Sequence, residues 1–545
     1  MSLPAPPLAR ARMEAEIAAD SRFDVVVIGG GITGAGTFRD LAMQGLRVLL
    51  VERGDFASGA SGALTRVAHG GFRYLERGEI ELVRESVEER DRLIANAPHA
   101  VRPIRVVLPL RSRFGGLFAA PLRFLRLLPG HGLPGIVPMA IGARLYDALA
   151  GRSPVLPRSG VAAGKSARRR FPYLDRKFAG AVWTYEGRIH APERVAIELV
   201  EDGVASGGGS AALNYCRLVA AEGTTLHLEN QLSGQSFSVT ARAVVNAAGA
   251  HADKVAALFG IREKMTGGIA GIHLILDAPE LAARLGDDLF FFEDNHDDPA
   301  KRRLCVVYRL ADDRVLLGTT EWACDDPDTA TATEADERYL LDALAAALPD
   351  VALSRDTVVA HLIGVRPVVR SKEANLANRS RSHAIFRHEA NKLPVVTIVG
   401  GKWTTFRRMA EDTTDTVLQI LGRRRSVSTR DLAIGGGKPR FSGGDGRQQL
   451  AEALQAAGIE PVLAARLIET YGSRAATVAE WILAHGADPI SDDGRLTRGE
   501  VAFFRDAELA VSADDIIRRR TDQYLRAPDR EALARRLELC RESTG

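Results

Sequence analysis

Three spaced glycines and one glutamate form the strongest chemical signal in this sequence. Gly29, Gly31 and Gly34 stand in the pattern Gly-x-Gly-x-x-Gly, and Glu52 follows about 20 residues later. In this pattern the first glycine allows a tight turn, the second lets backbone N–H groups approach a pyrophosphate, and the third permits close packing of a helix on a strand. The acid accepts hydrogen bonds from ribose hydroxyls. The pattern therefore predicts a dinucleotide site, although by itself it does not separate FAD from NAD.

These residues need a strand, a turn and a helix to position them, and the flanking sequence supplies each. Residues 23–29 form an apolar, β-branched run, which predicts a strand buried on both faces in a parallel sheet. A helix is expected over residues 37–44, and a second strand over residues 45–51 ends at the acid. The N-terminus of the helix would add partial positive charge for the phosphates.

A second strand end far downstream favours FAD. The apolar run at residues 243–245 leads into Asn246, Ala247, Ala248 and Gly249. Flavoproteins with a dinucleotide-binding fold bring the chain back across the cofactor through a strand that ends in small residues. We therefore expect Asn246, Ala248 and Gly249 to lie beside FAD.

Cations and histidines elsewhere in the chain are of the types that bind and deprotonate a small anion. Arg73, Arg366 and Lys402 are cations of this kind, and arginine offers planar, bidentate recognition of phosphate. His69 and His273 suit removal of an alcohol proton near neutral pH, because an unperturbed histidine has a pKa of about 6.5. Since the chain is rich in arginine, these residue types alone predict no more than FAD and a small anionic ligand.

The composition is that of a soluble globular protein with several domains. The chain has 545 residues, of which 46% are hydrophobic and 26% charged. Its 72 basic and 69 acidic residues give a net charge of +3, too balanced for nucleic acid as a partner. The four cysteines form no Cys-x-x-Cys pair, so neither a metal site nor a disulfide framework is expected. Without a signal-peptide-like segment or a long apolar run, a cytoplasmic protein is predicted.

Six segments resemble the FAD-dependent glycerol-3-phosphate dehydrogenase family. They are residues 23–36 (FDVVVIGGGITGAG), 52–58 (ERGDFAS), 69–76 (HGGFRYLE), 364–367 (GVRP), 400–407 (GGKWTTFR) and 506–521. The HGGxRYLE and GGKxTT segments are the most specific of these. The resemblance implies an α/β fold with an FAD-binding Rossmann-like domain of glutathione-reductase type, a mixed-sheet substrate domain and a C-terminal all-helical cap domain.

The resemblance also implies roles for individual residues. It surrounds the substrate with Arg73, Tyr74, Arg366 and Lys402, and Arg381 is a weaker further cation. His273 or His69 is the general base, and Arg366 could also lower the pKa of the alcohol. The expected cofactor contacts are Gly29, Gly31, Gly34, Glu52, Arg66, His69, Gly70, Asn246, Ala248, Gly249, Gly401, Lys402 and Thr404.

The resemblance and the breaks in composition divide the chain into segments. They are an N-terminal extension (1–21), three parts of the FAD-binding domain (22–104, 151–254 and 364–432), a basic apolar insertion (105–150), a substrate-binding domain (255–363), a linker (433–446) and a helical domain (447–545). Within the first part, the charge-rich residues 78–96 are expected to form an exposed helix.

The insertion raises the question of membrane contact. Residues 105–144 combine Leu, Phe and Ile with several arginines and contain no acid, and prolines prevent one continuous helix. Such a segment suits an interfacial membrane anchor. The alternative is an insertion packed into the core with its arginines reaching out to solvent.

The function expected from the resemblance is oxidation of sn-glycerol 3-phosphate to dihydroxyacetone phosphate. Hydride passes to flavin N5 and electrons continue to quinone, with oxygen as the alternative acceptor. The protein is expected to be peripheral to the inner face of the cytoplasmic membrane, and a homodimer is a further expectation. Departures from the family pattern at residues 63–66 and 188–194 keep other substrates open, namely another polyol phosphate, a 2-hydroxy acid or an amino acid. A non-catalytic flavin-binding membrane-associated protein is a third alternative, against which retention of the three cations weighs.

Overall fold

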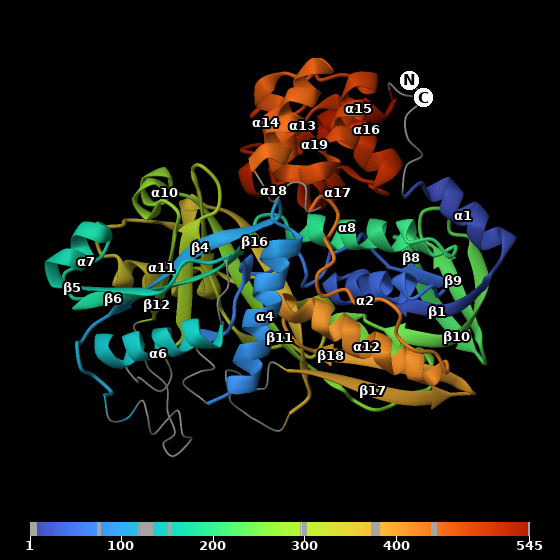
Figure 1. Cartoon of the computed structure of the whole chain (residues 1–545), viewed down its shortest axis with the longest axis horizontal. Coiled ribbons are helices and arrows are strands. Elements are labelled where there is room, and N and C mark those ends of the chain that lie inside the picture. Colours follow the sequence, from blue (N-terminus) through green and yellow to red (C-terminus); the bar gives the residue numbers. More distant parts are fainter. Residues whose placement is uncertain are drawn as a thin grey trace.

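Two β-sheets stand side by side, and helices from the C-terminal part of the chain lie above them in the view of Figure 1. This computed structural model describes residues 8–72, 78–117, 119, 134–150, 155–294, 296, 302–371, 382–437 and 444–542.

The first sheet carries the glycine turn. In the part of the chain that the structure describes it has eight strands, in the order β17-β18-β10-β1-β2-β7, with β9 beside β10 and β8 beside β9. They are β1 (Arg22–Ile28), β2 (Val48–Val51), β7 (Ala211–Leu213), β8 (Cys216–Glu222), β9 (Thr225–Asn230), β10 (Ser236–Asn246), β17 (His383–Ala390) and β18 (Leu393–Gly400). The neighbours from β18 to β7 run parallel, as in a nucleotide-binding sheet.

Strand β1 is buried on both faces, as its sequence predicts. Val25 packs with Phe38 on one face, whereas Val26 packs with Met13 on the other, because successive residues of a strand point to opposite faces. Helices α2 (Ile32–Met43), α8 (Pro192–Ala205) and α12 (Phe406–Ile420) lie together on the first face, and α1 (Arg10–Ala19) packs on the second (Figure 1).

The second sheet is mixed, which confirms the predicted fold class. Its ten described strands follow the order β15-β11-β14-β13-β12-β4-β6-β3, with β16 beside β11 and β5 beside β6. They are β3 (Val67–Ala68), β4 (Val101–Leu110), β5 (Gly160–Ala163), β6 (Gly180–Ile189), β11 (Thr266–Asp277), β12 (Asp288–Glu293), β13 (Leu304–Arg309), β14 (Arg314–Gly318), β15 (Trp322–Ala323) and β16 (Val358–Val369). Strands β4 and β12 run parallel, and the other described pairs are antiparallel.

Helices flank the second sheet and fill the C-terminal domain. Those beside the sheets are α4 (Ile80–Asn96), α6 (Ile136–Leu149), α7 (Gly164–Arg170), α9 (Ala252–Leu258), α10 (Pro279–Leu285) and α11 (Glu334–Ala347), with short turns η1 (Gly249–His251), η3 (Pro327–Thr329), η4 (Arg355–Thr357) and η6 (Trp403–Thr405). The C-terminal domain contains α13 (Gly444–Ala456), α14 (Pro461–Tyr471), η8 (Gly472–Arg474), α15 (Ala475–His485), α16 (Arg498–Ala507), α17 (Ala513–Asp515), η9 (Ile516–Arg520), α18 (Gln523–Arg526) and α19 (Arg530–Glu542).

The helix predicted over residues 78–96 is present as α4, but only one face of it is exposed. Arg90 and Glu89 are buried charges on this helix. Arg90 forms an ion pair with Glu186 of β6, and Glu89 forms one with Arg407 of α12. The charged pattern predicted a solvated face, whereas these charges point inward because each has a buried partner from another element.

The insertion expected over residues 105–150 begins inside strand β4. Residues 105–110 pair with β6, and residues 105–107 also pair with β12. Val107 is fully buried. The apolar character of residues 105–110 therefore reflects a core strand, and the chain leaves the sheet only after Leu110. Residues 118 and 120–133 of this segment lie outside the described residues.

Two other expected boundaries differ from the strand pairing. Strands β5 and β6 lie within the segment 151–254 assigned to FAD binding, yet they belong to the second sheet. Strand β16 pairs with β11 as far as Val369, so the boundary expected at residue 364 falls inside a strand. Local sequence predicts a strand but does not say which of two sheets the strand joins.

None of the described helices is both long enough and apolar enough to cross a bilayer.

Candidate active site

The turn after β1 is shaped by close backbone approach. A Cβ atom on Gly29 would lie 2.6 Å from the Ala247 carbonyl oxygen, and one on Gly34 would lie 1.8 Å from the carbonyl oxygen of Gly29. Gly34 therefore has the packing role predicted for it. Helix α2 begins after Gly31 without a side-chain cap at that residue, and the Ile32 N–H donates to Ser61 Oγ at 2.9 Å. The turn thus presents a helix N-terminus suited to phosphate.

Glu52 follows β2 and ties the turn to the next loop. One carboxylate oxygen accepts from the Gly30 N–H at 2.6 Å, and the other accepts from the Gly54 N–H at 2.8 Å. Burial raises the pKa of Glu52, although these two N–H groups act in the opposite direction. Glu52 also lines a large cavity beside the glycine turn. It therefore lies where the sequence predicted a cofactor contact, and it also holds two backbone N–H groups, which the sequence did not predict.

A cavity of about 1030 Å³ joins the glycine turn to the second sheet. This volume is at the upper end for ligand pockets, as a cofactor together with a substrate requires. Of the predicted residues it brings together Gly29, Gly31, Glu52, His69, Ala248, Gly249, Arg366, Gly401, Lys402 and Thr404. Residues 58–61 and 63–65 also line it.

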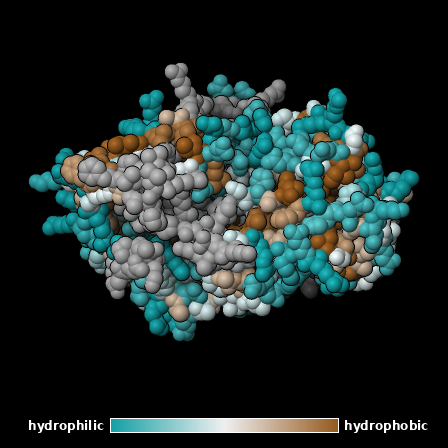
Figure 2. Space-filling model, turned by 90° about the horizontal axis from the view of Figure 1, so that it is seen from below, coloured by the Kyte–Doolittle hydropathy of each residue, from teal (hydrophilic) through white to brown (hydrophobic). Residues whose placement is uncertain are grey.

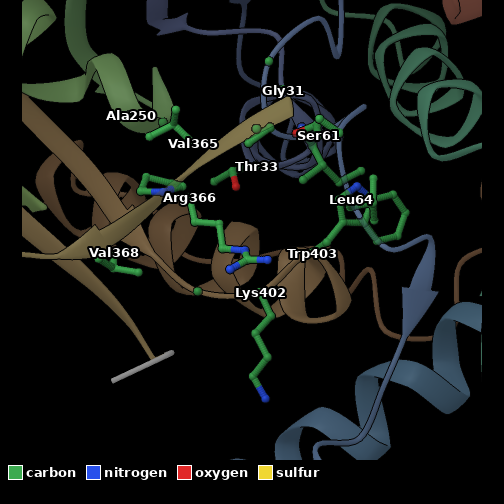
Figure 3. A pocket seen from close by; sticks show the side chains of 18 of the residues that line it. Gly31, Thr33, Ser61, Leu64, Ala250, Val365, Arg366, Val368, Lys402 and Trp403 are labelled. Atoms are coloured by element: carbon green, nitrogen blue, oxygen red, sulfur yellow. The ribbon is translucent and has the colours of Figure 1, made fainter. Parts of the chain in front are cut away.

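Arg366 and Lys402, two of the cations that line this cavity, come from different elements. Arg366 lies on β16, and its Nη1 donates to Glu321 Oε1 at 2.5 Å. Lys402 follows β18, and its ammonium group donates to Ser86 Oγ on α4. Figure 3 shows the Arg366 side chain extending toward the turn that carries Lys402 and Trp403. The Lys402 side chain extends from this turn in the direction away from Arg366. Lysine and arginine at this place give the cavity positive charge for an anionic group.

His69 belongs to a turn that is held from two sides. Its backbone N–H donates to Thr404 Oγ1 at 3.1 Å, and the Gly70 N–H donates to Glu186 Oε2 at 3.0 Å. Glu186 also accepts from the Tyr146 hydroxyl at 2.7 Å. Gly70 itself does not line the cavity, because it is buried against Tyr146. The Gly70 N–H is bonded to Glu186, so the predicted contact of Gly70 with the cofactor is not present.

His273 lies behind the cavity wall. Its side chain is only 2% exposed, and Nε2 lies 2.8 Å from Oγ1 of Thr65, which does line the cavity. Burial lowers the pKa of His273 to about 3, and the positive charges of Arg366 and Arg66 add to this effect. The imidazole is therefore neutral at physiological pH and reaches the cavity through a hydroxyl.

Arg66 differs from its predicted role as a cofactor contact. Its guanidinium donates to Glu193 Oε1 at 2.6 Å and to the His190 carbonyl oxygen at 2.9 Å. Both side chains of the ion pair are buried, and Arg66 does not line the cavity. These partners hold the guanidinium inside the protein, so the predicted contact of Arg66 with the cofactor is not present in the cavity lining.

Asn246 supports the cofactor side indirectly. Its side-chain amide donates to the Ala252 carbonyl oxygen at 2.8 Å, and its Oδ1 accepts from the Ala248 N–H at 3.3 Å. Asn246 is fully buried and shapes the turn whose other members line the cavity. Arg73, Tyr74 and Arg381 lie outside the described residues.

Sequence reasoning missed Ser61, Thr65, Glu186 and Glu321. Ser61 caps the helix after the glycine turn, Thr65 contacts His273, and Glu321 pairs with Arg366. Each acts through a partner that is distant along the chain. Only the departure noted at residues 63–66 drew attention to the neighbourhood of Thr65.

The fold and the cavity define a dinucleotide-binding oxidoreductase with a substrate sheet beside its nucleotide sheet. Residues 24–407 match the family model described as FAD dependent oxidoreductase, and residues 427–543 match the C-terminal domain of alpha-glycerophosphate oxidase.

Curated relatives match most of the chain. A glycerol-3-phosphate dehydrogenase of Synechocystis is 30% identical over 529 residues, which cover 92% of this chain and 89% of the relative. The mitochondrial glycerol-3-phosphate dehydrogenase of Homo sapiens is 32% identical over 492 residues, 84% of this chain. The match spans 61% of that mitochondrial relative's length.

Among solved structures, the glycerol-3-phosphate dehydrogenase of Bacillus halodurans in complex with FAD superposes with a TM-score of 0.73 at 22% identity. It covers 98% of this chain and 93% of that one. An L-alpha-glycerophosphate oxidase of Mycoplasma pneumoniae with FAD bound shares the fold at a TM-score of 0.53. The chain belongs to the FAD-dependent glycerol-3-phosphate dehydrogenase family.

FAD is the cofactor, and the residues present fit it. The glycine turn leaves no room for a Cβ at Gly29, the start of α2 lines the cavity through Gly31 and Thr33, and Glu52 lines it as well. These groups are suited to the pyrophosphate and a ribose.

Proposed function

We propose that the protein oxidises sn-glycerol 3-phosphate to dihydroxyacetone phosphate and passes the electrons to a membrane quinone. The observation that carries the substrate is the presence of Arg366 and Lys402 in the cavity that also holds the glycine turn. The names of the relatives support it, since the Synechocystis and mitochondrial proteins are glycerol-3-phosphate dehydrogenases.

Arg366 and Lys402 bind the substrate's negative charge in this proposal. The guanidinium can give two parallel N–H donors to a phosphate, whereas the ammonium group acts as a compact charge. Glu321 holds one guanidinium nitrogen of Arg366, which fixes the plane of that group. The predicted contacts of Arg73 and Tyr74 with the substrate remain part of the proposal.

In this proposal the proton of the substrate hydroxyl is transferred to His273 through the Thr65 hydroxyl. With the imidazole proton on Nδ1, Nε2 of His273 accepts from the hydroxyl of Thr65, a residue that lines the cavity. Because the charge of Arg366 helps to lower the pKa of His273, an anion bound at Arg366 raises that pKa and makes the imidazole a better base. His69 lines the cavity directly and is the second route for the proton.

Bound FAD supplies the two-electron acceptor for the hydride that leaves the carbinol carbon. The chain's own residues hold the anion and take up the proton.

Delivery of electrons to quinone would bring the protein to a membrane surface. Phe114, Ile141 and Leu145 are large apolar side chains that are 65%, 63% and 40% exposed. Two of them lie on α6, at the end of the molecule where Figure 2 shows apolar surface beside the grey atoms. Exposed Arg111, Arg113 and Arg144 lie in the same segment. Apolar insertion with surrounding arginines suits an anionic interface.

Anaerobic mixing with glycerol 3-phosphate tests the proposal. Loss of the oxidised flavin absorption within the enzyme's turnover time is expected, followed by recovery when a quinone analogue is added. Bleaching only by another polyol phosphate, a 2-hydroxy acid or an amino acid would reassign the substrate, and no bleaching by any of them would indicate a non-catalytic flavoprotein. Recovery with oxygen but not with quinone would reassign the acceptor.

A further inference from the structure

A carboxylate next to the cofactor site is held by the C-terminal helical domain. Asp55 lies three residues after Glu52, and its side chain is fully buried. Arg519 Nε donates to Asp55 Oδ2 at 2.7 Å. Arg520 donates through Nη1 to the same oxygen at 2.7 Å and through Nη2 to Oδ1 at 3.0 Å. Asn214 Nδ2 completes the set with a bond to Oδ1 at 2.8 Å.

The loop that contains Asp55 forms one wall of the cofactor cavity. Residues 58–61 line that cavity, the Ala57 N–H donates to the Gly30 carbonyl oxygen at 3.0 Å, and Ser61 Oγ caps the first helical N–H after the glycine turn. Asp55 is therefore connected to the phosphate-binding turn through a short, hydrogen-bonded stretch of chain.

The two arginines come from the short η9 turn, far along the chain. Arg520 is buried, and its Nη2 also donates to the Glu508 carbonyl oxygen at 2.7 Å. Glu508 forms a further buried ion pair with Arg194 of α8. Removing one partner of a buried ion pair is strongly destabilising because it leaves an uncompensated buried charge, so these ion pairs tie the loop to the helical domain.

We propose that Arg519 and Arg520 are positioning residues for the FAD site, and that the C-terminal helical domain acts to retain the cofactor. By holding Asp55, they keep residues 55–61 folded over the glycine turn. When this anchor is lost, the loop moves away from the turn and FAD dissociates faster, while the substrate cations Arg366 and Lys402 keep their places. The inference concerns FAD alone, so it stands whichever substrate the cavity accepts.

The test measures release of FAD from the full-length protein. Flavin fluorescence is followed after dilution of the holoprotein into buffer without FAD, well below the unfolding temperature. Arg520→Ala and Asp55→Asn should each release FAD roughly 10- to 100-fold faster, the range expected for loss of charge-assisted hydrogen bonds. Arg520→Lys should recover part of the retention. Combining Arg520→Ala with Asp55→Asn should add little to either single change, because both remove the same contact.

A matched control separates this role from general weakening of the helical domain. Arg466 forms an ion pair with the buried Glu500 at 2.7 Å, and both residues belong to the helical domain and, in the described part of the chain, make no hydrogen bond to Asp55. Arg466→Ala should keep wild-type FAD release even if it lowers the unfolding temperature. Should Arg520→Ala fail to fold, Arg519→Ala tests the same anchor from the more exposed arginine. Wild-type release in the folded variants of the anchor, or equal acceleration in Arg466→Ala, would overturn the proposal.

Discussion

Thr65 Oγ1 lies 2.8 Å from Nε2 of His273, so a residue that lines the cavity is in contact with a buried imidazole that does not line it. This contact joins the loop after the cofactor-binding segment to strand β11 of the second sheet. In the proposed mechanism it connects a buried histidine to the substrate, while burial lowers the pKa of the imidazole and keeps it neutral.

The Thr65–His273 contact predicts which changes slow proton removal. Thr65→Val and His273→Asn should each lower kcat at least about 10-fold with flavin content unchanged, since general base catalysis contributes about 10²–10⁴-fold. Steady-state kinetics with an artificial acceptor measures this. The substrate phosphate also titrates near pH 6, so an acid limb in the pH–rate profile does not by itself identify the base. The pH–rate profile of His69→Asn is therefore compared with that of His273→Asn. If His69→Asn alone abolished the acid limb of the pH–rate profile, the base would be His69.

Arg366 and Lys402 should matter for catalysis and not for flavin binding. Arg366→Ala or Lys402→Ala should lower kcat/KM roughly 10- to 150-fold, which corresponds to about 1.5–3 kcal/mol for a lost charge-assisted contact. Arg242→Ala is the control, because Arg242 forms an exposed ion pair with Asp24. Wild-type kinetics in both cavity variants would remove these residues from the substrate site.

The exposed apolar residues near α6 should govern membrane attachment. Phe114→Ser, Ile141→Ser and Leu145→Ser together should release the protein from anionic vesicles and leave flavin content unchanged. High salt should only weaken wild-type binding, since screening reduces the arginine contribution but not apolar insertion. Vesicle sedimentation measures both effects.

A control triple variant tests whether this surface is specific. Val462, Leu483 and Leu539 are 84%, 52% and 65% exposed on the C-terminal helical domain, and their replacement by Ser should leave vesicle binding intact. Wild-type protein that stays in the supernatant at low salt would contradict membrane attachment through α6.

His190 predicts part of the acid sensitivity of the fold. Burial, assisted by Arg188 and other nearby arginines, lowers the pKa of His190 to about 3. In the unfolded chain the pKa returns to about 6.5, so the unfolded state binds the additional proton below that pH. The free energy of unfolding should therefore fall as the pH drops from about 6.5 toward 3, by up to about 1.4 kcal/mol per pH unit from this residue.

Urea unfolding of wild type and His190→Gln at pH 7 and pH 5 measures this contribution. The variant should lose less stability between the two pH values than the wild type does. An identical loss in both proteins would mean that His190 is protonated equally in the folded and unfolded states.

Several features of the site followed from the sequence alone. The glycine pattern, the apolar strand before it and Glu52 predicted a nucleotide turn, because these features depend on residues that are close together along the chain. The second strand end at Asn246–Gly249 favoured FAD. The identity of the cofactor and of the family was accessible because short motifs carry it.

Partners that are distant along the chain were decided by the tertiary structure. Arg66 has the charge for a phosphate contact, but its guanidinium forms a buried ion pair with Glu193. Residues 78–96 have the charge pattern of an exposed helix, yet Arg90 of that helix pairs with Glu186 from another element. Asp55 and the two arginines that surround it lie in separate family-like segments, and nothing in either segment shows that they meet. The sequence shows only that a charged side chain needs either an oppositely charged partner or water. The packing of the two sheets and the helical domain determines which of these it contacts.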